Sequence, residues 1–437
     1  MNISVIGIGY VGLVSAVCFA EMGHHVSCID IDQSKINRLN EGQIPIYEIG
    51  LTELLEKNKD KISFTTDFSI LEHTPDAVFV AVGTPQSDDG SAYMEYFYQA
   101  VISIAKHINR YVVIVNKSTV PIGTSEHVRS LINAQLQKQN KNISIDVVSN
   151  PEFLREGTSI KDFMEPDRIV VGVSSTKARE IMDEIYRPLT EQGYKIIFCD
   201  NRTAETIKYA ANAFLAVKLS FINEISALCD SIGADVNKVA YGIGMDKRIG
   251  KAFLKAGPGY GGSCFPKDTQ ALCCMADAYS ADLSIVKSAI SANSHQKKRM
   301  CEKISNAMDG NINGKTIALL GLAFKKNTDD MRYSPALEIV DFLYQHGANI
   351  RAYDPAAMNN AKDNYFKNMD IYYAKDAYDT LKDAEALVIM TEWDEFKELD
   401  LVFVKKQMAG NIFIDLRNLY DRSDLEQAAF DYSCVGR

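Results

Sequence analysis

Short runs of apolar, mainly β-branched residues recur along the N-terminal part of the chain, separated by longer segments of mixed polarity. Such runs predict strands that are buried on both faces of a parallel sheet, and the intervening segments are long enough for helical crossovers. We predict strands over residues 3–6, 26–29, 77–82, 112–115 and 145–148. Two more, over 169–173 and 196–198, are predicted at the far edge of the sheet.

Between about residues 204 and 240 the apolar positions take the period of a helix, and no proline interrupts them. This segment predicts one long central helix joining two halves, followed by helices over 266–278 and 284–308. Its apolar periodicity is more extensive than a surface helix needs. We therefore expect the central helices of two chains to pack together in at least a homodimer. The apolar positions are Ile207, Ala211, Phe214, Leu215, Phe221, Ile222, Ile225 and Leu228.

A second series of strand-like runs follows the turn-like segment 311–315, over residues 316–320, 349–353, 386–390 and 412–415. Its start, IALLGLAF at 317–324, resembles the start of the chain, ISVIGIGY at 3–10. The expected fold class is α/β, with two doubly wound, Rossmann-like domains joined by a central helical region. The expected domains are residues 1–203, 204–308 and 309–437.

Composition narrows the possible functions. The chain has 437 residues, of which 46% are hydrophobic and 24% charged, as in an ordinary globular protein. Its net charge of −10 argues against broad electrostatic attraction to nucleic acid or acidic membranes. We find no run of about 18 uncharged apolar residues, so no membrane span is predicted. The nine cysteines form no disulfide or zinc pattern, and we expect a cytoplasmic protein without a bound metal.

A dinucleotide-binding motif follows the first predicted strand. Gly7, Gly9 and Gly12 permit a tight turn, close approach of the backbone to a pyrophosphate, and close packing of helix on strand. The helix that begins here offers N–H groups to the phosphates. Asp30, 18 residues beyond Gly12, is placed to accept hydrogen bonds from the adenine ribose. An acid there repels a 2′-phosphate and favours NAD over NADP, although the nearby cation Lys35 could contact the same ribose.

Cys264 lies in a second glycine-rich segment, GPGYGGSCFPKD at residues 257–268. Pro266 suits the first turn of a helix, so Cys264 is predicted just before a helix N-terminus, with Lys267 close by. A helix dipole and a neighbouring cation both lower the pKa of a thiol and raise its thiolate fraction. Cys264 is therefore a stronger nucleophile candidate than the other cysteines.

Four segments together carry a resemblance to a known family: KSTVP at 117–121, NPEFLREG at 150–157, the Cys264 segment, and FKKNTDDMR at 324–332. With the glycine motif, they resemble the UDP-glucose/GDP-mannose dehydrogenase family, in the same order and from residue 1 to about residue 420. The resemblance implies oxidation of the C6 hydroxyl of a nucleotide sugar to a carboxylate, with two NAD and one water. Cys264 is implied to form a thiohemiacetal and then a thioester, which water hydrolyses.

The resemblance also implies roles for other residues. Lys208 and Asn212, spaced i, i+4 on the central helix, would stabilise and hydrogen-bond the C6 oxygen. Asp268 and Thr119 would hold or activate a water, and Glu152 is the candidate general base. The implied cofactor contacts are Gly7, Gly9, Tyr10, Val11, Gly12, Asp30, Lys35, Thr84, Thr119, Glu156 and Arg332.

The implied substrate contacts combine cations suited to a diphosphate with aromatic rings suited to a base. Arg417 resembles a residue that family members contribute from the neighbouring subunit. The second half lacks the full glycine motif, which agrees with its binding the nucleotide sugar and not a second NAD. The contacts are Glu152, Phe153, Leu154, Arg155, Glu156, Lys208, Asn212, Arg248, Phe253, Leu254, Lys255, Gly259, Tyr260, Gly261, Phe324, Lys325 and Arg417.

Within the family, the segments 246–250 and 166–170 and the Phe265-Pro266 pair resemble the UDP-glucose branch. GDP-mannose is the second choice and UDP-N-acetylhexosamines the third. A non-catalytic protein that binds NAD and a nucleotide sugar is the alternative from a different class. It is disfavoured because Cys264, Lys208 and Asp268 are all present.

Overall fold

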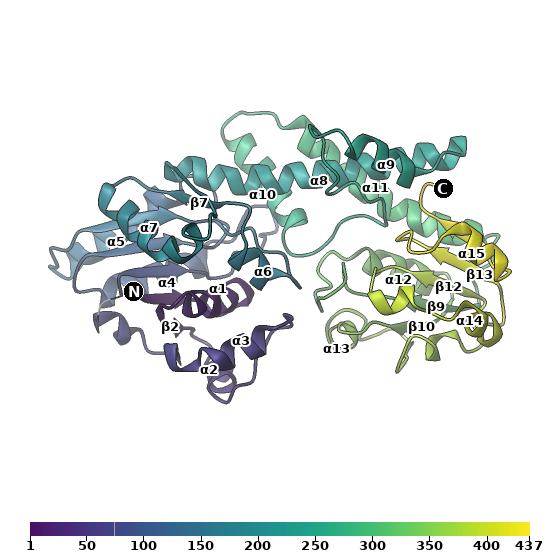
Figure 1. Cartoon of the computed structure of the whole chain (residues 1–437), viewed down its shortest axis with the longest axis horizontal. Helices are drawn as coiled ribbons and strands as arrows, with labels where there is room; N and C mark the ends of the chain where they lie inside the picture. The colour runs from purple at the N-terminus through teal and green to yellow at the C-terminus, as the bar shows by residue number, and fades with distance from the viewer. Residues whose placement is uncertain (74) are drawn as a thin grey trace. The chain divides into compact units, whose positions relative to one another are not determined.

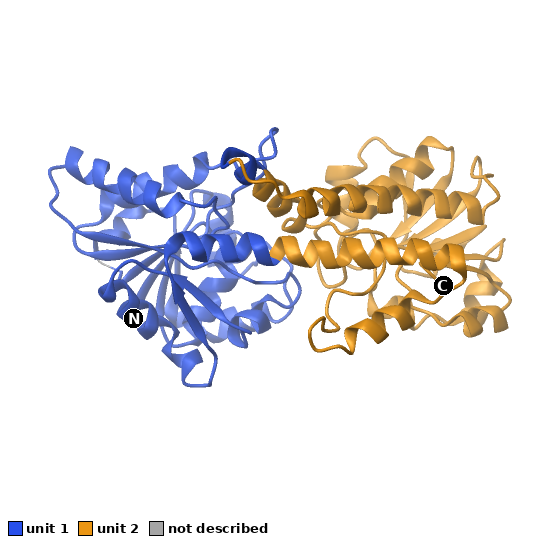
Figure 2. Ribbon diagram, turned by 90° about the horizontal axis from the view of Figure 1, so that it is seen from above, with its two compact units in different colours: residues 1–211, 274–279 blue, residues 212–273, 280–437 orange. Residues whose placement is uncertain are grey.

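The computed structural model describes residues 1–73 and 75–437, and the chain divides into two compact units (Figure 2). The first unit comprises Met1–Ala211 and Cys274–Tyr279, and the second comprises Asn212–Cys273 and Ser280–Arg437. Each unit contains one sheet. Two helices, α8 (Asn201–Ile232) and α10 (Phe265–Ala278), contribute residues to both units.

The sheet of the first unit is drawn in purple and blue in Figure 1. It has eight strands in the order β3-β2-β1-β4-β5-β6-β7-β8. Neighbouring strands are parallel except β6 and β7, which meet antiparallel through Ser149 and Gly172. The order reverses between β1 and β4, the point where such sheets bind ligands at the carboxyl ends of their strands. The strands are β1 (Asn2–Ile6), β2 (His25–Ile29), β3 (Ile62–Thr65), β4 (Ala77–Val80), β5 (Val112–Asn116), β6 (Ile145–Ser149), β7 (Ile169–Gly172) and β8 (Ile196–Cys199).

Helices cover both faces of this sheet because successive strand residues point to opposite faces. On one face Val5 shares a buried cluster with Leu13 of α1. On the other face Val80 shares a cluster with Val101 of α4 and Ile132 of α5. The helices are α1 (Tyr10–Glu21), α2 (Gln33–Asn40), α3 (Leu51–Lys57), α4 (Glu95–His107), α5 (Thr124–Lys138), α6 (Ser159–Met164) and α7 (Thr176–Thr190), with 3-10 turns at Lys59–Lys61 and Phe68–His73.

The sheet of the second unit has six parallel strands in the order β11-β10-β9-β12-β13-β14, the order of a dinucleotide-binding sheet. Along β9, Ile317 and Leu319 face one core cluster, whereas Ala318 and Leu320 face the other. The strands are β9 (Thr316–Leu320), β10 (Asn349–Tyr353), β11 (Ile371–Tyr373), β12 (Ala386–Ile389), β13 (Ile412–Asp415) and β14 (Asp431–Cys434). The helices are α12 (Pro335–Gln345), α13 (Met358–Asn360), α14 (Leu401–Gln407) and α15 (Arg422–Gln427), with short turns at Ala361–Tyr365, Asp379–Leu381 and Asp394–Lys397.

The helical region that separates the two sheets in the sequence consists of α8, α9 (Val236–Gly244), α10 and α11 (Ser284–Ala307). The prediction of one helix over 204–240 is wrong in its last part. Gly233, with a φ of 72°, ends α8 in the left-handed conformation that glycine adopts most readily. Asp235 then caps α9 by accepting hydrogen bonds from the N–H groups of Asn237 and Lys238. Helix α8 is apolar and long enough to span a membrane by length and composition, a signature that core helices share.

Every predicted strand is present, with ends shifted by at most two residues, and the expected α/β fold class is confirmed. The sequence patterns missed three strands, β3, β11 and β14, and all three lie at sheet edges. Edge strands are buried less completely than central ones. Their apolar signal is therefore weaker, as the partly exposed residues of β3 illustrate.

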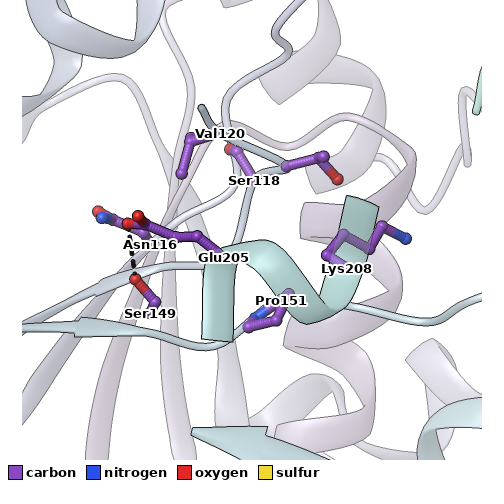
Figure 3. Close-up of a pocket in the computed structure, with 8 residues that line it drawn as sticks. Asn116, Ser118, Val120, Ser149, Pro151, Glu205 and Lys208 are labelled. Atoms are coloured by element: carbon purple, nitrogen blue, oxygen red, sulfur yellow. Dashed lines mark hydrogen bonds between the residues drawn. The ribbon is translucent and has the colours of Figure 1, made fainter. Parts of the chain in front are cut away.

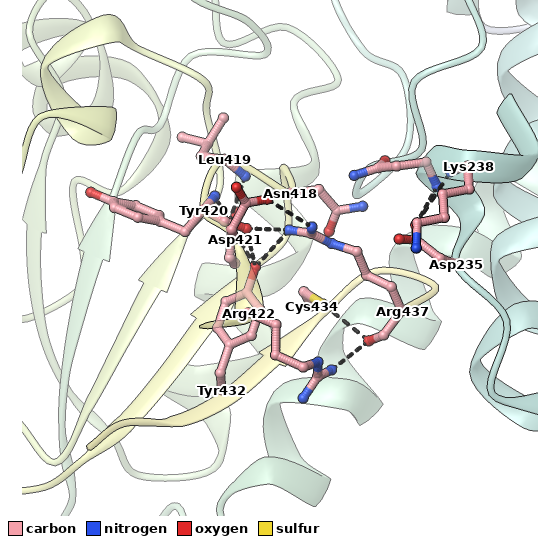
Figure 4. A network of polar contacts seen from close by, with 12 residues as sticks. Asp235, Lys238, Asn418, Leu419, Tyr420, Asp421, Arg422, Tyr432, Cys434 and Arg437 are labelled. Carbon is pink, nitrogen blue, oxygen red and sulfur yellow. Dashed lines mark hydrogen bonds and ion pairs between the residues drawn. The ribbon is translucent and has the colours of Figure 1, made fainter. Parts of the chain in front are cut away.

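A polar network fastens the end of the second sheet to the helical region (Figure 4). The guanidinium of Arg437 donates to the Tyr432 hydroxyl at 3.0 Å and to the carbonyl of Tyr420. The carbonyl of Gly436 accepts a hydrogen bond from Val236 N, at the start of α9, at 2.8 Å. These contacts fix the loop after β13, which carries Arg417, on the same scaffold as α8 and α9.

Candidate active site

The glycine turn of the first unit has the geometry that the motif predicted. A Cβ on Gly12 would lie 1.9 Å from the carbonyl oxygen of Gly7, so only glycine lets α1 start this close to β1. Gly7 has a φ of +89°, and a Cβ there would lie 2.9 Å from Val82. A Cβ on Gly9 would meet nothing within 4 Å. The space beside Gly9 is therefore available for a pyrophosphate at the N-terminus of α1.

The Asp30 carboxylate lies directly beside this turn. Its Oδ2 accepts hydrogen bonds from Ile8 N at 2.7 Å and Lys35 Nζ at 2.9 Å. Burial by itself would raise the pKa of Asp30, but the hydrogen bonds from Lys35 and two backbone N–H groups outweigh it and lower the pKa overall. Asp30 therefore remains ionised and can accept hydrogen bonds from ribose hydroxyls, so the turn and the acid together fit NAD.

Tyr10 connects the glycine turn to the segment that carries Glu152 and its neighbours. Its hydroxyl donates to Glu48 Oε2, and the same carboxylate accepts from Gly157 N at 2.6 Å and Ser159 N at 2.8 Å. Burial raises the pKa of Tyr10, and the bond to Glu48 raises it further, so the phenol keeps its proton. Glu48 was not predicted as a site residue because its two backbone partners, Gly157 N and Ser159 N, lie more than 100 residues further along the chain.

Glu152 and Lys208 form a buried ion pair, with Lys208 Nζ donating to Glu152 Oε1 at 2.9 Å. The other oxygen of Glu152 accepts from Leu154 N at 2.5 Å. The ring of Phe153 lies 5.4 Å from Lys208 Nζ and only 3.5 Å from the guanidinium of Arg168. The structure thus brings the predicted base and the predicted charge-stabilising lysine into direct contact.

A hollow of about 210 Å³, including space open to solvent, lies beside this pair in the first unit (Figure 3). Thr119 lies in its wall, and its carbonyl accepts a hydrogen bond from the Thr84 hydroxyl at 2.9 Å. Figure 3 shows Glu205 directed toward Ser149 and Lys208 directed away from it. The lining residues are Asn116, Ser118, Thr119, Val120, Ser149, Pro151, Glu205 and Lys208.

Glu205 holds the loop after Thr119. Its carboxylate accepts from Gly123 N at 2.6 Å, the Ser125 hydroxyl at 2.6 Å and the Ser149 hydroxyl at 3.0 Å. A carboxylate at the N-terminus of α5 is favoured by the helix dipole. Sequence reasoning missed Glu205, whose donors are 56 to 82 residues away.

In the second unit, buried polar side chains fasten the glycine-rich loop before Cys264. Asn293 of α11 both accepts from Tyr260 N at 2.8 Å and donates to Tyr260 O at 3.1 Å. Gln296 donates to Gly257 O at 2.6 Å, and Asn223 of α8 accepts from Gly257 N at 2.9 Å. These contacts account for the loop's fixed path, and none of the three amides was predicted.

Cys264 lies immediately before α10, with intermediate exposure. Its carbonyl accepts a hydrogen bond from Asp268 N at 2.8 Å, so Asp268 is one helical turn away, as predicted. The buried Asp268 carboxylate accepts from Asn212 Nδ2 at 2.6 Å and from Lys267 Nζ at 2.7 Å. The helix starts at Phe265, one residue earlier than Pro266 suggested. The predicted carboxylate and amide are therefore in contact with each other, one helical turn beyond Cys264.

Arg417 and Phe324 are also in contact. The guanidinium donates to Phe324 O at 2.8 Å and Met390 O at 2.7 Å, and it pairs with Glu392 at 3.1 Å. A Cβ on Gly262 would lie 2.7 Å from the Phe324 ring, which places this ring against the glycine-rich loop. Arg417, Phe324 and the glycine-rich loop of the second unit therefore lie together.

Three predicted arginines instead pair with neighbouring carboxylates. Arg155 pairs with Asp162, and Arg332 pairs in a bidentate manner with Asp330. Arg248 pairs with Asp246 and is 89% exposed. In this structure their guanidinium groups are oriented by these carboxylates, and their predicted ligand contacts stay predictions.

Comparisons with known proteins match the chain in three consecutive parts. The UDP-glucose/GDP-mannose dehydrogenase family models match as NAD binding domain over residues 1–190, central domain over 202–295 and UDP binding domain over 318–422. A UDP-glucose 6-dehydrogenase of Rhizobium meliloti is 48% identical over 442 residues, covering 100% of both chains. The chain belongs to the UDP-glucose/GDP-mannose dehydrogenase family.

Solved structures of this family agree with the fold. A UDP-glucose dehydrogenase from Pyrobaculum islandicum has a TM-score of 0.89 and 35% identity, covering 99% of this chain and 96% of that one. A UDP-D-ManNAc dehydrogenase from Pyrococcus horikoshii has a TM-score of 0.87 and 26% identity, covering 100% and 99%. Membership confirms the predicted family resemblance and NAD as the cofactor.

Proposed function

We propose that this chain oxidises UDP-glucose to UDP-glucuronate with two NAD and one water. The observation that carries the proposal is the cluster around Cys264: a thiol before a helix N-terminus, with the buried Asp268 one turn away held by Asn212 and Lys267. A thiol beside a positioned carboxylate and amide suits covalent capture of an aldehyde followed by hydrolysis.

We favour UDP-glucose over other nucleotide sugars as the substrate because of the sequence identities to the named relatives. The relative from Rhizobium meliloti, named as a UDP-glucose 6-dehydrogenase, shares 48% of its residues with this chain. The named UDP-D-ManNAc dehydrogenase shares only 26%. GDP-mannose and UDP-N-acetylhexosamines remain the alternatives to test.

The residues near Cys264 would act in order. After the C6 hydroxyl becomes an aldehyde, the Cys264 sulfur bonds to C6 and its proton passes to the C6 oxygen, forming a thiohemiacetal. The second oxidation leaves a thioester. Water held by Asp268 then attacks the carbonyl carbon, the C–S bond breaks, and the sulfur regains a proton. Lys208 and Asn212, one turn apart on α8, would stabilise negative charge on the C6 oxygen.

NAD, when bound, accepts a hydride in each of the two oxidations. In the first unit, the N-terminus of α1 beside Gly9 would bind its pyrophosphate, and Asp30 would bind its adenine ribose. Glu152 would take the proton of the substrate hydroxyl, since it is buried and held in place by Lys208 and Leu154. NAD dependence also fits the predicted cytoplasmic location.

The test combines a substrate panel with changes at Cys264. Wild-type protein should form two NADH for each UDP-glucose and oxidise GDP-mannose and UDP-N-acetylhexosamines poorly. Cys264→Ala should fold and bind NAD but form no acid, because no thioester can form. Cys264→Ser should accumulate an ester-linked sugar, detectable by mass spectrometry of the intact protein, because an alkoxide is the poorer leaving group. Cys274→Ala, at another partly exposed cysteine of α10, is the control.

Two results would contradict this mechanism. Near-normal acid formation by Cys264→Ala would leave a hydrated aldehyde as the second-step substrate and remove the covalent step. Binding of NAD and UDP-glucose by the wild type without any NADH formation would favour the non-catalytic alternative.

We also propose that the working unit is at least a dimer formed through α8. Phe214, Phe221 and Leu228 recur every seven residues along one face of the helix, and all three are exposed. Exposed apolar stripes of this kind are characteristic of association surfaces. Phe221→Lys should yield a monomer in sedimentation at assay concentration, whereas Val402→Lys, at an exposed apolar position of α14, should not. An active wild-type monomer would exclude this proposal and a role for Arg417 across a subunit boundary.

A further inference from the structure

Lys117 is a buried cation to which the proposed reaction assigns no role. It directly follows β5, and its side chain is only 4% exposed. Its ammonium donates to Asn150 Oδ1 at 3.1 Å and lies 5.6 Å from the Phe163 ring. Among residues 1–73 and 75–437 the ammonium forms no ion pair. A buried charge bonded only to a neutral amide is costly, so its presence calls for a reason.

Holding Asn150 in place does not supply that reason. Asn150 Oδ1 also accepts a hydrogen bond from the Tyr186 hydroxyl at 2.5 Å, and Asn150 Nδ2 donates to Val170 O at 2.8 Å. Asn150 N in turn donates to Asn116 O at 2.9 Å. The side-chain oxygen, the side-chain amide and the backbone N–H of Asn150 would each keep a partner without Lys117.

Lys117 lies next to the candidate active site. Its partner Asn150 precedes Glu152 by two residues, and Ser118 and Thr119, which directly follow Lys117, line the same hollow as Lys208. Burial lowers the pKa of Lys117 to about 8, the Glu152 carboxylate counteracts this, and Lys208 adds to it by repulsion. The remaining titratable neighbours are Cys18, whose pKa burial raises, and Tyr186, which is bonded to Asn150. At neutral pH the group is mainly protonated, so two buried ammonium groups accompany the single carboxylate of Glu152.

We propose that Lys117 is a positioning residue whose buried positive charge acts through the Glu152–Lys208 pair, keeping the carboxylate available as a base and favouring negative charge on the substrate oxygen. This inference rests on the proposed function, because each step at C6 places negative charge on an oxygen. A fixed cation in a site shielded from water stabilises such charge without needing to move. The benefit to the reaction would explain why the chain keeps a charge where an apolar side chain would cost less.

The first test separates this role from a structural one. Lys117→Met matches the length of the side chain and removes the charge. It should leave the thermal stability unchanged or raise it at neutral pH, with NAD affinity unchanged. In the wild type, the folded protein binds the proton of Lys117 less tightly than the unfolded chain does. The free energy of unfolding therefore rises with pH between about 8, the pKa of Lys117 in the folded protein, and 10.5, the ordinary pKa of a lysine. The gain from Lys117→Met should therefore be complete below pH 8 and shrink across that window.

The second test measures the charge in catalysis. With UDP-glucose, Lys117→Met should lower kcat about tenfold or more. The acidic limb of its kcat/KM profile should move up by about one pH unit, because a carboxylate that loses a nearby cation binds protons more readily. Lys117→Gln, which can still donate to Asn150, should behave like Lys117→Met. Lys138→Met, at an exposed position of α5, should match the wild type.

Each other outcome overturns the inference. Wild-type kinetics in Lys117→Met would show that the positive charge of Lys117 has no role in catalysis. Loss of stability with an unmoved pH profile would show that Lys117 is structural, and recovery by Lys117→Gln would show that the hydrogen bond matters and not the charge. A wild-type protein that oxidises no nucleotide sugar would refute the proposed function itself, a result that the variants cannot mimic.

Discussion

The two sheets of this protein share one strand order over six strands but differ at the turn after their first strand. After β1, α1 begins at Tyr10, directly beyond the glycine turn. After β9, Gly321 makes an equivalent turn with a φ of +94°, but the next helix, α12, starts only at Pro335. A helix N-terminus therefore lies at the carboxyl end of the first sheet's central strand, and the second sheet has an irregular loop in that place.

The two sheets also differ in how the aspartate after their second strand uses the N–H groups of the glycine turn. Asp30 accepts one hydrogen bond from its glycine turn, at Ile8 N, and pairs with the partly exposed Lys35. Asp354 is almost fully buried and accepts bonds from Leu322 N at 2.7 Å and Ala323 N at 3.0 Å. The carboxylate of the second sheet thus occupies the N–H groups that a phosphate would need.

This difference shows how one topology serves two ligands. The first turn leaves N–H groups and a ribose-binding acid available, which suits a dinucleotide. The second turn is closed by its own aspartate, and the cations that we predict to contact a nucleotide sugar, including Lys255 and Arg417, lie outside this turn. The family's NAD binding and UDP binding domains fall on these two sheets in the same order. Four substitutions test this contrast.

Asp354→Ala should have the largest effect. Asp354 also accepts from Ala356 N, Ala357 N and Trp393 Nε1, so its loss leaves five donors without their acceptor. Leaving such groups unsatisfied should lower the free energy of unfolding by about 3–5 kcal/mol. Urea unfolding would measure the loss, and NAD affinity of the remaining folded protein should be unchanged. An unaltered midpoint would mean that Asp354 does not hold the second turn closed.

Gly12→Ala should be the next most damaging change. Its Cβ would lie 1.9 Å from the Gly7 carbonyl oxygen, so α1 must move away from β1. Such overpacking should cost about 3 kcal/mol of unfolding free energy and abolish measurable NAD binding. Gly9→Ala is the matched comparison, since its Cβ has open space. Gly9→Ala should fold normally yet bind NAD at least about tenfold more weakly, as calorimetry can show. Equal stability losses in both would disprove the separate roles of the two glycines.

Sequence patterns predicted the periodic features of this protein well. Strand Thr316–Leu320 has the predicted bounds because nearly all of its residues are buried. Strand Asn349–Tyr353 has them because its two buried residues alternate with more exposed ones, which gives a regular pattern of period two. The break at Gly233 was missed because the apolar period continues through it into α9. Local signals of a single glycine and a following aspartate were outweighed by the longer pattern.

The residues of the candidate site also divide into those that the sequence could predict and those that it could not. Residues such as Cys264 and Asp30 lie in short motifs, and their predicted neighbours, Asp268 and Lys35, are close in sequence. The residues that hold the site together could not be predicted in this manner. Glu205 and Asn293 obtain their roles from donors far away along the chain, and a buried carboxylate or amide has no distinctive local pattern.

Asp30→Ala should affect ligand binding more than folding. The change removes the acceptor for the adenine ribose, which should weaken NAD binding by about 1–3 kcal/mol, the range for unmatched hydrogen-bond partners. It should also reduce the discrimination against NADP. Titration of both cofactors, with Asp32→Ala at the neighbouring exposed N-cap of α2 as control, measures the effect. Equal turnover of the wild type with NADP and with NAD would show that Asp30 does not bind the hydroxyls of the adenine ribose.

Lys35→Ala should have the smallest effect and reveals how the first turn keeps its acid ionised. Lys35 is partly exposed, so losing its ion pair should cost less than about 1 kcal/mol of NAD affinity at neutral pH. Its hydrogen bond is the leading contribution that lowers the pKa of Asp30 against the effect of burial. In the wild type, NAD affinity should therefore persist into acid and decline only below the ordinary range of an aspartate. In Lys35→Ala, burial is less fully opposed, and the decline should begin at higher pH. Calorimetric titrations from neutral to acid pH decide the matter: coincident pH profiles would mean that Lys35 contacts the cofactor without tuning Asp30.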